Sequence, residues 1–219
     1  MTTQDACIDV SHAAPYQRAG RVRWSEVATT ARLAILRACY RSSPDESYAA
    51  HVRAARDAGI ATGAYAFLRP GGMQEQIDAF LATVKPGPGA LCVADYEDYK
   101  GGIPTADEAW AWCSAVKAAT GALPLLYSRA GLLDAHVPAG HPLHACLLWL
   151  SGYPVVGGAQ LAAWDWKPHT LAIPKGWTGD DAVLWQYTSQ GRVRGIDGDV
   201  DRNVGDLARV FATWPGATS

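Results

Sequence analysis

The sequence predicts an α/β fold, a single abbreviated and flattened barrel of about five β/α units followed by three further strands. In the first half of the chain, short apolar runs alternate with segments of helical spacing. Strands separated by helices of this size indicate βαβ units and a parallel sheet. From Leu147 onward, the expected strands follow one another without convincing helices between them. A full eight-fold barrel needs about 250 residues, and this chain has 219.

The individual elements follow from apolar runs and from the residues that end them. Gly59 ends a helix, Arg69-Pro70-Gly71-Gly72 closes a strand, and Thr105 with Glu108 forms a capping box. The expected strands are Ala6–Val10, Leu33–Cys39, Ile60–Leu68, Ala90–Glu97, Leu123–Tyr127, Leu147–Leu150, Leu161–Trp166, Ala182–Tyr187 and Arg192–Ile196. The expected helices are Trp24–Thr30, Ser47–Ala58, Gln74–Val84, one capped by Thr105 that runs to Ala119, and Val204–Thr213.

Composition excludes several classes of protein. The chain is 49% hydrophobic and 18% charged, which allows a substantial core. The formal net charge is -2 and no basic patch is present, which argues against nucleic acid as the main partner. No apolar run is long enough to span a bilayer, so no membrane insertion is expected. The five cysteines form no CxxC pair, which indicates buried thiols rather than disulfides or a zinc site.

The most informative stretch is Asp95-Tyr96-Glu97, which follows an apolar run. Residues i and i+2 of a strand point to the same side, so the two carboxylates share a face. Carboxylates this close repel each other, and one pKa rises. Such a pair can supply a proton donor and a permanent anion from similar side chains. A solvated acidic turn after a strand explains the spacing about as well.

Polar and aromatic side chains gather at the predicted C-terminal ends of the strands, where a barrel of this type builds its site. An acidic centre ringed by Trp and Tyr suits a neutral sugar, because CH faces stack on aromatic rings and hydroxyls bond to carboxylates. The candidate residues are Asp9, Arg37, Tyr65, Asp95, Glu97, Tyr127, Trp149, Trp185, Gln186, Tyr187, Asp199 and Asp201.

Simpler explanations compete for several of these residues. Asp9 could be a turn former or a helix N-cap, and Arg37 could be a structural partner of the carboxylates. About half of the late tryptophans are expected to face the groove, with the others in the core. Asp199 and Asp201, together with Gly198, loosely resemble a calcium loop, but the Gly and Glu of an EF-hand do not follow. Neither a metal nor another cofactor is therefore expected.

Several motifs, in order along nearly the whole chain, resemble the glycoside hydrolase family 25 muramidases, which include phage endolysins. Each motif is weak alone, and their order and spacing make the resemblance specific. The resemblance implies a flattened barrel and lysozyme activity on the β-1,4 bond between N-acetylmuramic acid and N-acetylglucosamine in peptidoglycan. The motifs are Cys7-Ile8-Asp9-Val10-Ser11, Ile35-Leu36-Arg37-Ala38, Gly63-Ala64-Tyr65-Ala66-Phe67-Leu68-Arg69-Pro70, Asp95-Tyr96-Glu97, Leu184-Trp185-Gln186-Tyr187-Thr188-Ser189, Gly195-Ile196 and Val200-Asp201-Arg202-Asn203.

The resemblance also implies roles for the acidic residues. Glu97 would be the general acid that protonates the leaving oxygen, with a raised pKa. Asp95 would stay ionised and orient the 2-acetamido group or stabilise an oxocarbenium-like state. Asp9 and Asp201 would complete the acidic cluster. Whether the sugar's own acetamido group or a protein carboxylate attacks stays open. The residues implied to line the sugar groove are Tyr65, Tyr127, Trp185 and Gln186.

The chain departs from the family pattern in several places, one of which is Gly89-Ala90-Leu91-Cys92-Val93-Ala94, the approach to the acidic pair. Ala66 stands where the family usually carries His, so a substrate contact is expected to be lost or supplied elsewhere. Ser151–Asp181 is rich in Gly, Pro and Trp and has no clear counterpart. Two alternatives to a muramidase stay open, a wall-binding module that lost turnover and a hydrolase of another N-acetylglucosamine polymer such as chitin. The retained carboxylate pair favours an enzyme.

Residues 1–219 are expected to form one catalytic domain, with no separate cell-wall-binding domain, because no linker rich in Pro, Gly or Ser divides them. The expected partner is the glycan strand of peptidoglycan, and the expected state is a monomer. No signal peptide is visible. The expected setting is a phage-encoded protein that accumulates in the host cytoplasm and acts on the cell wall, or a bacterial protein exported without a signal peptide.

Overall fold

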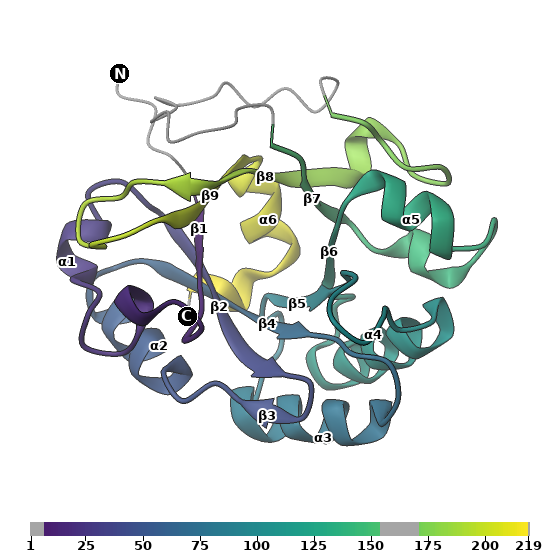
Figure 1. Ribbon diagram of the computed structural model, residues 1–219, viewed down its shortest axis with the longest axis horizontal. Helices are drawn as coiled ribbons and strands as arrows, with labels where there is room; N and C mark the ends of the chain where they lie inside the picture. The colour runs from purple at the N-terminus through teal and green to yellow at the C-terminus, as the bar shows by residue number, and fades with distance from the viewer. Residues whose placement is uncertain (1–6, 154–170, 219) are drawn as a thin grey trace.

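The computed structural model describes residues 7–153 and 171–218 (Figure 1). Eight strands form a closed barrel in the order β1-β9-β8-β7-β6-β5-β4-β2, with β1 paired to β2 and the short β3 added beside β2. The strands are β1 (Cys7–Val10), β2 (Leu33–Tyr40), β3 (Ser43–Pro44), β4 (Ala61–Phe67), β5 (Cys92–Asp95), β6 (Leu125–Ser128), β7 (Leu148–Ser151), β8 (Ala182–Gly191) and β9 (Val200–Gly205). The helices are α1 (Trp24–Val27), α2 (Tyr48–Asp57), α3 (Met73–Val84), α4 (Ala106–Thr120), α5 (Ala130–His136) and α6 (Leu207–Thr213).

The strand directions confirm the predicted fold class. Neighbouring barrel strands are parallel except at β9, which runs antiparallel to both β8 and β1. Strands β1, β2, β4, β5 and β6 are each followed by helical structure, and β7, β8 and β9 complete the barrel. The antiparallel β9 closes the barrel, so the first and last strands of the chain lie side by side.

Two expected elements differ from the structure, and one helix is present that was not expected. Arg192–Ile196 is not a strand, because the chain turns there at Gly195, whose φ is 94°. Val204 belongs to β9, since pairing with β8 extends this strand to Gly205 and the closing helix α6 begins at Leu207. Helix α5 was not expected from the sequence. The expected strand Leu161–Trp166 lies outside the described residues.

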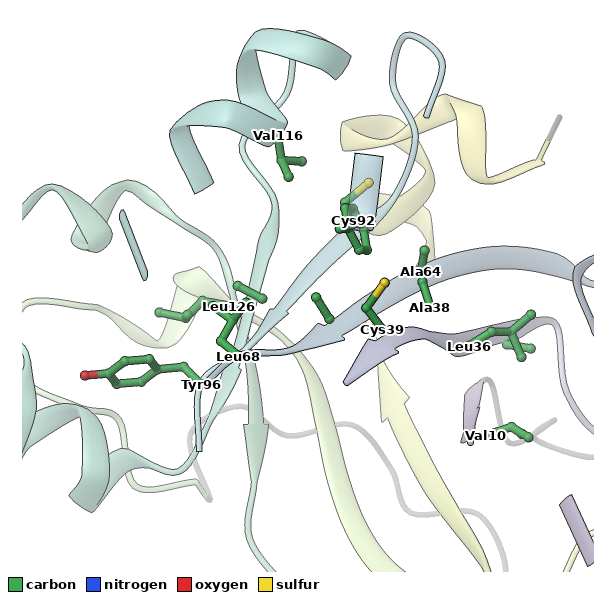
Figure 2. Packing of buried hydrophobic residues seen from close by; sticks show 14 of the residues in the cluster. Val10, Leu36, Ala38, Cys39, Ala64, Leu68, Cys92, Tyr96, Val116 and Leu126 are labelled. Carbon is green, nitrogen blue, oxygen red and sulfur yellow. The ribbon is translucent and has the colours of Figure 1, made fainter. Parts of the chain in front are cut away.

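Alternation along the strands sorts the side chains into two layers. Side chains that point outward pack between the barrel and its helices, as Figure 2 shows for Ala64, Leu126 and Val116 of α4. Side chains that point inward fill the barrel, and Leu33, Leu91 and Leu125 belong to that inner cluster. Strands β2, β4, β5 and β6 therefore bury one face against helices and the other inside the barrel, which is why their apolar runs show little polar interruption.

Helix α6 packs against the N-terminal ends of the parallel strands. Its side chains Leu207 and Val210, with Trp214 just beyond the helix, join the inner cluster. The indole Nε1 of Trp214 donates to the carbonyl oxygen of Leu123, 2.9 Å away, just before β6. The inner apolar cluster thus occupies this end of the barrel, and the polar inward residues lie toward the C-terminal ends of the parallel strands.

The cysteines are all free and buried, as the sequence predicted. Burial raises the pKa of the Cys92 thiol to about 12, so this thiol stays protonated at neutral pH. Across residues 7–153 and 171–218, none of the helices combines the length and apolar character that a bilayer crossing requires.

Candidate active site

A pocket of about 260 Å³ opens at the C-terminal ends of the barrel strands. A larger hollow of about 380 Å³ lies near Arg32 and Phe211, but no carboxylate side chain lines it. The chemistry therefore belongs to the smaller pocket, where four carboxyl side chains converge. Its lining residues are Asp9, Ser11, Arg37, Tyr65, Phe67, Asp95, Glu97, Tyr127, Trp149, Tyr153, Gln186 and Asp201.

Two of the four carboxyl groups share a proton. The register of β1 and β9 places Asp9 directly opposite Asp201, and two carboxylates that face each other in the barrel disfavour joint ionisation, so one of them favours a proton. Burial raises the pKa of Asp9 to about 6, opposed by its hydrogen bonds. Burial, and then the charge of Asp9, raise the pKa of Asp201 well above its usual range. Of the two, Asp201 therefore holds the proton more tightly, and Asp9 ionises first.

Side-chain amides hold the charged Asp9 in place. Its Oδ2 accepts from Nδ2 of Asn203 at 2.8 Å and from Nε2 of Gln186 at 3.0 Å. Aromatic donors fix both amides in turn. Trp149 Nε1 donates to Oδ1 of Asn203 at 2.8 Å, and Tyr127 Oη donates to Oε1 of Gln186 at 2.7 Å. The network leaves Asp9 little freedom to rotate, so its charge keeps a fixed position at the pocket wall.

The structure brings both Asp95 and Glu97 into the pocket. Asp95 is the last residue of β5, and Glu97 follows two residues later. Tyr96 between them lies in the outer apolar layer, and its backbone N–H donates to the carbonyl oxygen of Tyr127 at 2.9 Å. The strand's alternation thus continues past the end of β5, and the two carboxyl groups share a face as their spacing predicted.

Asp95 and Glu97 differ in their surroundings. Asp95 is 6% exposed, and its Oδ1 is buried without a hydrogen-bond partner among the described residues. Burial, and then Glu97 and Asp9, raise the pKa of Asp95 well above its usual range, while Arg37 opposes this rise. Burial also raises the pKa of Glu97, and the charge of Arg129 opposes that rise. Both groups therefore bind a proton more readily than a free carboxylate does.

The raised pKa of Asp95 differs from the sequence-based expectation, in which Asp95 stays ionised and Glu97 alone holds a proton. The spacing of the pair gave no measure of depth, and Asp95 proves to be the more buried of the two. The barrel also converges further carboxylates on Asp95, whereas Arg129, which follows β6, acts on Glu97. In the free protein the pKa of Asp95 is therefore raised further than that of Glu97, the reverse of the expected division of roles.

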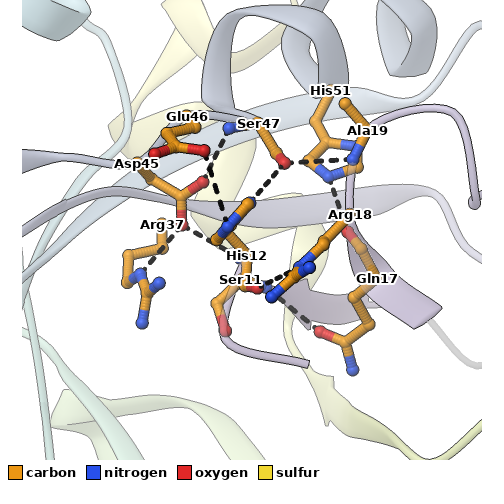
Figure 3. Close-up of polar contacts among 10 residues, drawn as sticks. All are labelled: Ser11, His12, Gln17, Arg18, Ala19, Arg37, Asp45, Glu46, Ser47 and His51. Carbon is orange, nitrogen blue, oxygen red and sulfur yellow. Dashed lines mark hydrogen bonds and ion pairs between the residues drawn. The ribbon is translucent and has the colours of Figure 1, made fainter. Parts of the chain in front are cut away.

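A buried aspartate positions the arginine of the pocket wall. Arg37 Nε donates to Oδ2 of Asp45 at 2.9 Å, and the Asp45 side chain is 1% exposed. Asp45 also accepts from the backbone N–H groups of His12 and Ser47, each at 2.9 Å (Figure 3). Three donors therefore fix Asp45, which holds the guanidinium beside the pocket, where it lowers the pKa of Asp95. Arg37 is thus an electrostatic partner of the carboxylates.

Three predicted site residues lie outside the pocket lining. In β8, Gln186 faces the pocket, so its neighbours Trp185 and Tyr187 point to the opposite face of the strand. Those two side chains pack in a separate apolar cluster with Val204. Asp199 forms an ion pair with Arg192 at 3.0 Å. The resemblance identified the right strand, but three consecutive residues of a strand cannot share a face.

Sequence reasoning also missed residues that the structure places at the site. Phe67 lies two residues after Tyr65, and Asn203 lies two residues after Asp201, so alternation could have found both. Ala66 lies in the outer layer and is 1% exposed, so the missing His removes no contact in the pocket. Ser11, two residues after Asp9, follows from the same rule, whereas Tyr153 also lines the pocket and the sequence gave no clear signal for it.

The Asp9–Asp201 pair predicts an unusual dependence of stability on pH. Because the folded state binds these protons more tightly than the unfolded state, the free energy of unfolding falls as pH rises from about 4 to about 6. The shift of the Asp9 pKa from 3.8 to about 6 corresponds to roughly 3 kcal/mol. Asp201 carries a further cost of the same sign, because its pKa is also raised, and we expect Asp201→Asn to relieve that cost, since an amide does not ionise and can still donate to Asp9.

Thermal unfolding measures this effect. At about pH 8 the variant's Tm should exceed that of the wild type by several degrees, and near pH 4 the two should converge. A gain of the same size at both pH values would show that the substitution acts through packing, contrary to the shared-proton account.

Comparison with known proteins agrees with this geometry. The family model described as glycosyl hydrolases family 25 matches residues 8–196. A bacterial lysozyme structure from Streptomyces coelicolor aligns with a TM-score of 0.76 and 26% identity, over 96% of each chain. The catalytic domain of endolysin ply40 from Listeria monocytogenes bacteriophage P40 aligns with a TM-score of 0.72 and 22% identity, over 97% of each chain.

A third solved structure, a muramidase from Trichobolus zukalii, has a TM-score of 0.70 and 22% identity, over 95% of this chain and 98% of its own. Among curated proteins, no sequence matched the chain. The family match spans most of the chain and includes Asp9, Asp95 and Glu97 of the carboxylate cluster. The chain therefore belongs to glycosyl hydrolases family 25, and it is a glycoside hydrolase.

Proposed function

We propose that the protein is an N-acetylmuramidase, a lysozyme that hydrolyses the β-1,4 bond between N-acetylmuramic acid and N-acetylglucosamine in peptidoglycan. The observation that carries this proposal is the Glu97 carboxyl group, which lines the pocket with a raised pKa beside three further carboxyl groups. Membership of the family, and the lysozyme and endolysin among its structural neighbours, support peptidoglycan as the substrate.

In the proposed reaction, Glu97 transfers its proton to the glycosidic oxygen. The bond from that oxygen to C1 breaks, its electron pair goes to the oxygen, and positive charge develops on the sugar ring. The charged Asp9 lies nearby, and the developing charge lowers the pKa of Asp95, so Asp95 passes its proton to solvent water as the charge forms and takes one back from solvent after hydrolysis. The group that first bonds to C1, either the acetamido oxygen or a carboxylate, stays open. In both cases water finally adds to C1, and one proton of that water passes to Glu97.

The pocket walls suit an N-acetylhexosamine. Tyr65, Tyr127, Trp149 and Tyr153 offer aromatic surface for the CH faces of the sugar. Tyr127 and Tyr153 both donate to Oε1 of Gln186, so these rings have fixed orientations. A preorganised wall of this kind holds the sugar in register with Glu97 without further ordering.

Analysis of the new reducing ends tests the proposed bond. Purified peptidoglycan is incubated with the protein, reduced with borohydride and analysed by mass spectrometry. A muramidase leaves N-acetylmuramic acid at the new end, so reduced muramic acid is expected. Glu97→Gln, prepared in the same way, is the control for contaminating hydrolases. Reduced glucosamine ends, or activity on chitin with none on cell wall, would contradict the proposal.

The proposal includes a partner and a setting. The glycan strands of peptidoglycan are the proposed partner of a monomeric catalytic domain. The free, buried cysteines fit a chain that folds in a reducing compartment. A phage-encoded protein that accumulates in the host cytoplasm before reaching the wall is consistent with this chemistry, and a bacterial protein exported by another route is the alternative.

A further inference from the structure

Three aromatic rings continue outward from the pocket wall, and we call Tyr40, Phe67 and Tyr99 the aromatic strip. Phe67 lines the pocket and pairs in register with Asp95 on one side and with Tyr40 on the other. The ring centroids of Phe67 and Tyr40 are 5.4 Å apart. Tyr99 contacts both rings edge-on, at 5.8 Å from Phe67 and 6.5 Å from Tyr40. The strip therefore leads directly from the carboxylate cluster to the rim.

Tyr99 is both exposed and held in place. Its relative exposure is 51%, high for a large apolar side chain. The buried Arg69 places its guanidinium carbon 5.6 Å from the Tyr99 ring centroid, and Nη2 donates to the carbonyl oxygens of Tyr99, at 3.1 Å, and Lys100. The same Tyr99 oxygen accepts from the N–H of Gly102 at 2.8 Å. The loop thus presents the ring from a fixed backbone.

Gly101 makes this support possible. Its φ is 97°, a conformation that side chains with a Cβ rarely adopt, and a Cβ there would come within 3.1 Å of Arg69 Nη2. A buried arginine, a tight turn and two edge-on ring contacts therefore fix one exposed aromatic side chain. An exposed ring that is already ordered binds a ligand without a further loss of conformational entropy.

We propose that the aromatic strip is an outlying subsite that binds a further sugar ring of the same glycan strand, beyond the sugars at the cleaved bond. This inference rests on the proposed function. A repeating polymer whose cleaved bond lies at Glu97 must leave the pocket along one of the pocket walls. Phe67 belongs to the pocket wall and contacts Tyr99, so it connects the wall to the exposed ring. The exposed part of the Tyr99 ring offers the flat apolar surface on which the CH face of a pyranose packs.

The proposal predicts a dependence on chain length. Peptide-free glycan strands from peptidoglycan are separated into long strands and the shortest cleavable oligosaccharide. Tyr99→Ala should raise KM on long strands by roughly fivefold to tenfold, with kcat and the rate on the short oligosaccharide unchanged. Tyr99→Phe keeps the ring and should behave as the wild type. Lys100→Ala, a change at the neighbouring exposed residue, is the matched control.

Each other outcome has a defined meaning. An equal loss on long and short substrates would overturn the proposal, because Tyr99 would then act on the cleavage site itself. A loss that appears on intact peptidoglycan but not on peptide-free strands would assign the strip to the stem peptide instead. If the wild type cleaves no strand, the proposed function fails. In that case calorimetry compares the affinity of long strands for the wild type and for Tyr99→Ala, which tests the subsite without cleavage. Equal affinity for the two proteins would overturn the subsite proposal.

Discussion

Glu97→Gln is expected to lower kcat on peptidoglycan by roughly a thousandfold, with KM nearly unchanged. The amide keeps the size and shape of the side chain but cannot transfer a proton to the glycosidic oxygen. Glu97 is partly exposed at the pocket, so the substitution leaves the core intact. Initial rates of reducing-end release from purified peptidoglycan measure the effect.

A matched control distinguishes loss of the acid from general damage to the site. Asp98 follows Glu97 directly, is exposed and pairs with Arg129 at the surface. Asp98→Asn changes the same charge one residue away and should keep most of the activity. Similar turnover by wild type and Glu97→Gln would refute the assignment of Glu97 as the proton donor.

Asp95→Asn should abolish most activity and stabilise the protein. As the residue whose charge offsets the positive charge on the sugar, Asp95 is expected to supply a factor of about 10²–10³ in kcat. Its pKa is raised well above the usual range, so the folded state binds the proton more tightly than the unfolded state. The free energy of unfolding therefore falls as pH rises, because Asp95 loses its proton more easily in the unfolded chain than in the folded protein. An amide removes that cost.

Two measurements on the same variant check this account. Thermal unfolding should give a higher Tm than the wild type at neutral pH, with a difference that shrinks toward acid pH where the wild-type carboxyl is protonated. Rates on peptidoglycan should fall on the identical preparation. A variant that loses both activity and stability would contradict the electrostatic cost assigned to Asp95.

The sequence predicted the parts of the site that depend on strand alternation. Asp95 and Glu97 are two residues apart after an apolar run, and the structure places both in one pocket. The same rule, applied to β4 and β9, accounts for Phe67 beside Tyr65 and Asn203 beside Asp201. Where the rule was set aside, as for the three neighbours Trp185, Gln186 and Tyr187, the expectation placed two side chains on the wrong face of β8.

Other features could not be predicted because they depend on register and on contacts distant in the sequence. The shared proton of Asp9 and Asp201 requires β9 to pair antiparallel with β1 at one register. Asp45 and Arg37 meet because β3 folds back on β2. The depth of Asp95 depends on the convergence of several strands, and this depth raises its pKa beyond what the neighbouring Glu97 alone implies. Short apolar runs carry no information on such geometry.

The central claim is that Glu97 supplies the proton to the leaving oxygen, and dependence on the leaving group tests it most directly. A leaving phenol of low pKa departs without protonation, whereas a sugar hydroxyl does not. Wild type and Glu97→Gln are compared on a glycan oligosaccharide and on an aryl β-glycoside of the same donor sugar with such a phenol. The account predicts a roughly thousandfold loss on the oligosaccharide and a small loss on the aryl glycoside. An equal loss on both substrates would contradict it.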